Sequence, residues 1–188
     1  MIDRVAGFAQ LERNLAIVLV LTPLLLIIFD EGPDNVRSTI SAYHDMAHPE
    51  PFFYPLTVAA MLFIVNGVLK HGHWYNWALG VLLSMVVLFD HDGATAIPHY
   101  TGAFGFFGGN VAAMAWFSTR KPVALKIGLI GTIIVALVLF VVADWFTLFW
   151  VEWVSLAIVA THYVLDSASW TKYQALTAND TAELMPAT

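Results

Sequence analysis

Cysteine is absent from the 188 residues, so disulfide bonds, thiolate metal ligands and cysteine nucleophiles are all excluded. Charge is also scarce: Asp, Glu, Lys and Arg make up 12% of the chain, well below the roughly 25% that is usual in soluble domains. The net charge of −6 leaves no excess of basic residues that would bind nucleic acid. The chain is instead 59% hydrophobic, which is the composition of a protein solvated by lipid.

Long apolar runs dominate the sequence. A helix needs roughly 20 apolar residues to cross the ~30 Å hydrocarbon core of a bilayer. Runs near this length predict an all-α fold, a six-helix transmembrane bundle: Asn14–Phe29, Phe52–Leu69, Trp74–Phe89, His99–Phe117, Ala124–Ala143 and Trp145–Leu165. The last two leave room only for a very tight turn at Asp144 and Trp145, and five spans with a broken helix there are the alternative. We expect residues 1–176 to form one domain and residues 177–188 to be a polar, disordered tail.

Basic residues are distributed unequally between the two sides of this bundle. Under the six-span arrangement one side receives most of them: Arg4, Arg13, Lys70, Arg120, Lys121, Lys126 and Lys172. Only Arg37 falls on the other side. Short connections rich in Lys and Arg stay in the cytoplasm. The pattern therefore predicts an N-in, C-in protein of the plasma (inner) membrane, with the 30–51 and 90–98 connections outside.

Both outer connections are rich in histidine and aspartate. If residues 38–48 are helical, His44 and His48 lie one turn apart on one face, a spacing at which two imidazoles can bind a metal ion. The second connection supplies Asp90 and Asp92, and His99 begins the helix that follows. A catalytic zinc ion needs about three protein ligands and a water molecule. We therefore predict a zinc site formed by His44, His48 and His99.

Such a site suggests a metal-dependent hydrolase that acts on a lipid amide or ester, with membrane lipids as its partners. Zinc would lower the pKa of its bound water to ~7. Asp90 or Asp92 would act as general base, and Ser41 or Tyr43 would stabilise the oxyanion. Two other interpretations stay open: a polar site without metal, or ordinary solvated loops, because Asp, His, Gly and Pro are common turn residues.

A Ser-x-x-Ser-x-Tyr pattern follows the first predicted span, at Ser38, Ser41 and Tyr43. In this feature the chain resembles a group of poorly characterised bacterial multi-pass membrane proteins. The resemblance covers the first four predicted helices, including Asp90 and His99. It implies a fold and no established activity.

The chain is similar, more loosely, to the superfamily of alkaline ceramidases and progestin/adipoQ receptors. Those membrane hydrolases carry Ser and His on one helix, Asp on the next and an HxxxH pair on the last. The similarity implies that Ser41 and His44 match the first element and Asp90 the second. The chain departs from the pattern in its last helix, which has His162 and Asp166, and in having six predicted spans rather than seven.

Other functions remain as alternatives. Gly105 and Gly109 form a GxxxG pair that predicts close helix packing, which would suit a non-enzymatic accessory or scaffold subunit of a larger membrane complex with a protein partner. A haem carrier needs histidines at matching depth on facing helices, and a transporter usually has broken helices in corresponding halves. Glu152 lies within the last span, so we expect it to find a partner such as Arg37 or a histidine.

Overall fold

The computed structural model describes residues 2–30, 32, 36–69, 73–117, 123–143 and 147–183, and within them the chain is all-helical. The α-helices are α1 (Ile2–Phe29), α2 (Glu50–Leu69), α3 (Tyr75–Leu88), α4 (Ala96–Ala112), α5 (Val123–Ala143) and α6 (Leu148–Glu183). Two 3-10 turns, η2 (Ser41–Asp45) and η4 (Gly93–Thr95), precede α2 and α4, and one π turn, η5 (Ala113–Phe117), ends α4. The all-α fold is confirmed.

Four of these helices are long and apolar enough to cross a membrane. The qualifying segments are Gln10–Phe29, Glu50–Leu69, Val123–Val142 and Leu148–Ala168. Helix α3 is also apolar but shorter, with 14 residues, and α4 has 17. Of the six helices that the sequence predicts to cross the membrane, four thus have the length and composition to do so.

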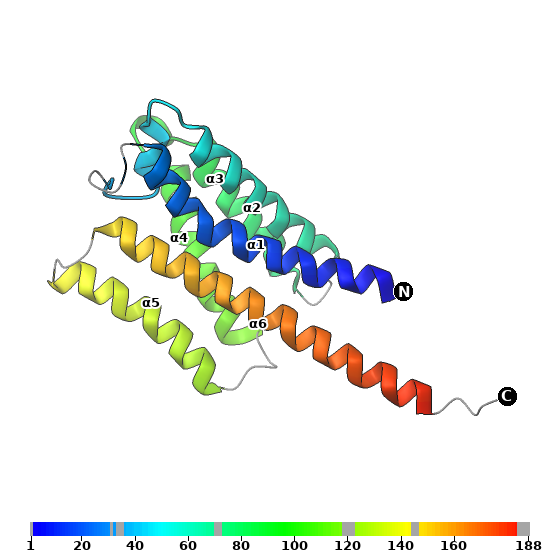
Figure 1. Cartoon of the computed structure of the whole chain (residues 1–188). Helices are drawn as coiled ribbons and strands as arrows, with labels where there is room; N and C mark the ends of the chain where they lie inside the picture. Colours follow the sequence, from blue (N-terminus) through cyan, green and yellow to red (C-terminus); the bar gives the residue numbers. More distant parts are fainter. Residues whose placement is uncertain are drawn as a thin grey trace.

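The helices run back and forth along one axis (Figure 1). Helix α1 packs against both α2 and α6, α2 packs against α3, and α3 packs against α4. Helix α5 lies along α6 and also contacts η5. The start of α1 and the end of α6 lie at one end of the bundle, while residues 36–49 and 89–95 and the start of α6 lie at the other (Figure 1). We call this second end the loop end.

Two helices extend more than ten residues beyond the predicted spans. Helix α1 begins at Ile2 rather than at Asn14. Helix α6 continues through Glu183, into the segment that the sequence predicts to be a disordered tail. No glycine or proline occurs between Leu148 and Glu183, so nothing in this stretch breaks the helix. The turn predicted at Asp144 and Trp145 lies outside the described residues.

The core lies among α1, α2, α3, α4 and α6. At its centre the ring of Phe63 contacts Phe106 and Tyr163 edge to face, with centroids 5.4 Å apart in each pair. All three side chains are at most 1% exposed. Helix α5 is different, because only 6% of its spanning segment is buried. The packed helices therefore hold the loop end in place, and α5 covers one side of α6.

Candidate active site at the loop end

The connection between α1 and α2 is not the long helix on which the HxxxH spacing depends. Only residues Ser41–Asp45 form a helical turn, η2, and Met46 leaves it in an extended conformation with φ −71° and ψ 157°. His48 precedes Pro49, and a residue before proline disfavours the helical conformation. His44 therefore lies within η2, whereas His48 is exposed beyond it, and the two do not share a helix face.

Arg37 and Tyr43 fix this connection to the end of α1. The Arg37 guanidinium donates to both carboxylate oxygens of Asp30, at 2.7 and 3.1 Å, and to the Ala42 carbonyl at 2.9 Å. The hydrogen bond to Asp30 raises the pKa of Arg37. Tyr43 is fully buried, which raises the pKa of its phenol, and its hydroxyl accepts a 3.2 Å hydrogen bond from the Arg37 backbone N–H. Tyr43 thus anchors the connection and does not line the pocket described below.

Glu152 and Phe149 join α6 to the same connection. The Ile40 backbone N–H donates to the Glu152 carboxylate at 2.6 Å. The Phe149 N–H donates to the Ser38 carbonyl at 2.7 Å, which satisfies one of the free amides at the start of the helix. Glu152 therefore pairs with a backbone amide, while Arg37, its expected partner, pairs with Asp30.

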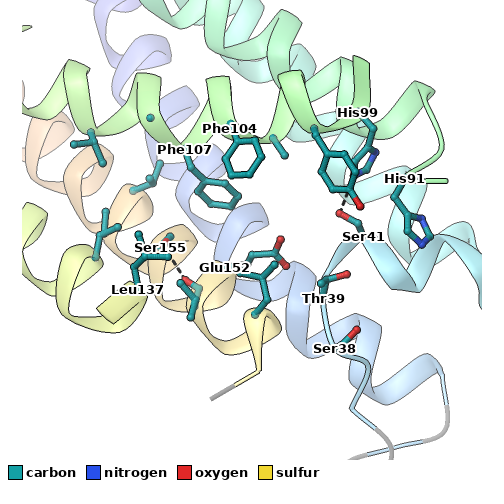
Figure 2. A pocket seen from close by; sticks show the side chains of 18 of the residues that line it. Ser38, Thr39, Ser41, His91, His99, Phe104, Phe107, Leu137, Glu152 and Ser155 are labelled. Atoms are coloured by element: carbon teal, nitrogen blue, oxygen red, sulfur yellow. Dashed lines mark hydrogen bonds between the residues drawn. The ribbon is translucent and has the colours of Figure 1, made fainter. Parts of the chain in front are cut away.

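Ser41 and His99 form a hydrogen-bonded pair at this end (Figure 2). His99 is 2% exposed, and its Nδ1 lies 2.8 Å from the carbonyl oxygen of Phe89. Because a carbonyl can only accept, Nδ1 must carry a proton. In the neutral imidazole Nε2 is then the free acceptor, and it lies 3.0 Å from the Ser41 hydroxyl. The Phe89 carbonyl thereby selects the tautomer in which His99 can take a proton from Ser41.

The pair lies at the polar end of a pocket of about 630 Å³ between α4, α5 and α6 (Figure 2). Its polar end is formed by hydroxyl, imidazole and carboxylate groups, from Ser38, Thr39, Ser41, His91, His99, Tyr100 and Glu152. Its body is mostly apolar and is lined by Ala103, Phe104, Phe107, Gly108, Val111, Ile133, Ile134, Leu137, Leu148, Val151, Ser155 and Val159. Ser155 directs its hydroxyl to the Val151 carbonyl, so it adds little polarity. The pocket therefore has the shape and chemistry to accept an apolar chain with a polar head.

Beside the pocket lies a group that we call the rim cluster: His44, Asp45, Asp90 and His91. Donor atoms of His44, Asp45 and Asp90 all lie within 4.8 Å of one another. Partial loss of water raises the pKa of Asp90, but a hydrogen bond from the Asp92 N–H and the neighbouring imidazoles of His44 and His91 outweigh this effect. The net pKa of Asp90 lies below its ordinary value, so it is ionised at neutral pH.

The structure divides the predicted site residues between these two places. His44 and Asp90 meet in the rim cluster, as expected for the two connections. His99 does not join them, because its two nitrogens are occupied by Phe89 and Ser41. With His48 exposed outside the cluster, the three imidazoles of the predicted zinc site do not come together in this structure. The Asp92 side chain is 82% exposed and stands at the edge of the cluster.

Sequence reasoning missed the pairing of Ser41 with His99. The two residues are 58 positions apart, and the sequence suggested Ser41 as an oxyanion donor and as a partner of His44, not of His99. One signal was available: His99 begins an apolar helix directly after a connection, where a buried imidazole needs a partner.

The chain belongs to DUF7103, a family of unknown function, whose characteristic sequence matches residues 21–167. This range contains Ser41, His99, Glu152 and all of the rim cluster. No curated protein and no solved structure matches the chain.

Proposed function

We propose that the chain is a membrane-embedded hydrolase that cleaves a lipid ester or amide, with Ser41 as nucleophile and His99 as general base. The observation that carries the proposal is the hydrogen bond between Ser41 and His99 at the polar end of an apolar pocket. A nucleophile in hydrogen-bond reach of a base that a third group orients is the arrangement that activates a serine. Here the orienting group is the Phe89 carbonyl.

The reaction follows from the positions of the protons. Ser41 Oγ attacks the acyl carbonyl carbon while its proton moves to His99 Nε2. The same proton then passes to the leaving alcohol or amine as its bond to the acyl carbon breaks, which leaves an acyl ester on Ser41. Water next gives a proton to His99 and attacks this ester, and His99 returns the proton to Ser41 as the fatty acid departs.

The pocket supports a lipid as the substrate. Pockets of roughly 300–1,000 Å³ bind ligands of drug or lipid size, and this pocket lies within that range. An acyl chain would lie along the apolar side chains of α4 and α5, such as Phe104 and Leu137, which would place its carbonyl near Ser41. No metal is needed for this first step, because His99 supplies the base. The metal dependence predicted from the sequence thus stays a separate proposal.

We place the loop end at the outer surface of the plasma (inner) membrane, with six crossings and both termini in the cytoplasm. Two observations support this arrangement. Seven of the eight basic residues belong to the predicted inner connections and termini. In addition, the start of α1 and the end of α6 both lie at the end of the bundle opposite the loop end (Figure 1). The scissile bond would then lie at the outer leaflet.

Covalent labelling tests the proposal without knowledge of the substrate. A fluorophosphonate with an alkyl chain reacts with activated serines, so we expect it to label the purified chain in mild detergent. Ser41→Ala should abolish labelling, and His99→Ala should slow it by about 10²–10⁴-fold because the base is lost. The same variants should lose activity toward fluorogenic acyl esters.

Ser38→Ala is the matched control, since Ser38 lies in the same connection and lines the same pocket but has an exposed side chain. Labelling that persists in Ser41→Ala, or that is absent from the folded wild-type chain, would contradict the proposal. In the second case the accessory-subunit interpretation would gain support if a protein partner co-purified with the chain.

A further inference from the structure

The rim cluster takes no part in the reaction proposed above, yet it gathers four metal-ligating side chains from two connections. His44 Nδ1 lies 3.3 Å from an Asp45 oxygen. His91 reaches both carboxylates, with Nε2 3.7 Å from Asp45 and Nδ1 3.1 Å from Asp90. This Nδ1 is buried and forms no hydrogen bond of normal geometry. The His91 ring therefore lies between two carboxylates, and within the described part of the chain its buried Nδ1 has no hydrogen-bond partner, which is unusual for a buried polar atom.

We propose that the rim cluster binds one divalent transition-metal ion, such as zinc. Two imidazoles favour zinc over magnesium or calcium, which prefer oxygen ligands alone. Zinc binds nitrogen and carboxylate oxygen at about 2.0–2.2 Å in tetrahedral geometry, so two of its ligand atoms are roughly 3.3–3.6 Å apart. The donor atoms of His44, Asp45 and Asp90 lie within 4.8 Å of one another, so side-chain movements of about an ångström would close the site around an ion.

The local charge and the access to water also favour a cation. Asp45 and Asp90 bring two carboxylates together, and the nearby Arg37 guanidinium is already held by Asp30 and the Ala42 carbonyl. The side chains of Asp45 and Asp90 are 53% and 44% exposed, so an ion can reach them directly from solvent. A divalent ion would neutralise both carboxylates, and His91 would complete the coordination.

A metal ion in the rim cluster would link the two segments that position Ser41 and His99. His44 and Asp45 belong to η2, the turn that carries Ser41, whereas Asp90 and His91 follow Phe89, whose carbonyl holds His99. An ion that binds both segments would therefore hold Ser41 against His99. This effect rests on the proposed hydrolase function, but the binding of the metal does not.

Zinc binding can be measured directly by isothermal titration of zinc chloride into the purified, chelator-treated chain in detergent. We expect one zinc ion per chain and a rise in melting temperature on its addition. Asp90→Asn, which keeps the shape of an exposed side chain, and His44→Ala should each weaken binding by about tenfold or more. His91→Ala should weaken it by about 10–100-fold.

His48→Ala is the control, because His48 lies in the same connection outside the cluster, and it should bind zinc as the wild type does. Ser41→Ala should also bind zinc normally, which separates this proposal from the hydrolase proposal. The inference is overturned if the wild-type chain takes up no stoichiometric zinc, or if Asp90→Asn retains full affinity. An equal loss in His48→Ala and His44→Ala would assign the metal to the HxxxH pair instead.

Discussion

Replacing single glycines of α4 with alanine should separate the face that packs against α3 from the face that lines the pocket. A Cβ atom at Gly102 would lie 2.6 Å from the Leu82 carbonyl oxygen and 2.8 Å from the Met85 Cβ. A Cβ atom at Gly108, which lines the pocket, would meet nothing within 4 Å. The two positions lie in the same helix, so they differ mainly in what surrounds them.

The expected magnitudes follow from two opposing effects. Alanine is favoured over glycine in a helix interior by up to about 1 kcal/mol, and both variants gain this amount. Only Gly102→Ala pays for overpacking, which costs about 1–3 kcal/mol when neighbours must move. The Leu82 carbonyl belongs to the backbone of α3, so the two helices must separate to relieve the contact. The free energy of unfolding of Gly102→Ala should therefore be about 1–3 kcal/mol lower than that of Gly108→Ala.

Unfolding in mixed detergent micelles, followed by the loss of helical circular dichroism, measures this difference for both variants and the wild type. Gly108→Ala should equal or exceed the wild type in stability, and Gly102→Ala should fall below Gly108→Ala. If the two variants are equally stable, α3 and α4 do not approach each other as described, and the positions of His99 and Phe89 at their ends lose support.

Two further predictions concern the interior and the orientation. Tyr163→Phe removes the hydroxyl that donates to the buried Asn76 side chain and leaves its amide oxygen without that donor, so it should lower the free energy of unfolding by about 1–3 kcal/mol in the same assay. Tyr100→Phe, at an exposed tyrosine, should change the free energy of unfolding little, and equal effects of the two variants would refute the buried contact. Because the chain has no cysteine, Ala94→Cys in the exposed η4 turn should react with a membrane-impermeant maleimide added to intact cells, whereas Thr188→Cys should react only after permeabilisation. The reverse pattern would invert the proposed topology.

The helices were predictable from the sequence because a long apolar run in a membrane has few other ways to form the hydrogen bonds of its backbone N–H and C=O groups. The predicted span Phe52–Leu69, for example, corresponds to α2, Glu50–Leu69. The hydrogen-bond partners of the polar side chains within these helices were less predictable. Asn66 bonds across helices to Glu12, whereas Asn110 bonds to the Phe106 carbonyl of its own helix. A polar side chain in an apolar helix can always bond to the carbonyl four residues earlier, so its residue type does not reveal its partner.

The GxxxG pair was likewise only a partial guide to the contacts between α3 and α4. Close packing at Gly105 and Gly109 is confirmed, because a Cβ atom at either would lie 2.7 Å from a leucine side chain of α3. The position at which a Cβ atom would come nearest to the backbone of α3 is nevertheless Gly102. This residue lies outside the motif and three residues after His99 in α4. The spacing of the glycines identifies which face of α4 carries small residues. How closely each of these residues approaches α3 depends on where α3 crosses that face.

Buried ionisable groups occur at both ends of the bundle, so their presence alone does not locate a site. Toward the termini, Glu12 accepts a hydrogen bond from Asn66, and His162 lies 3.3 Å from Asp166 one turn along α6. These groups pair with one another, and none of them lines the pocket. At the loop end the Ser41–His99 pair opens instead onto a space large enough for a ligand. Ionisable residues at membrane depth are candidates for function by default, and it is the adjoining space that favours Ser41 and His99 over His162 and Asp166.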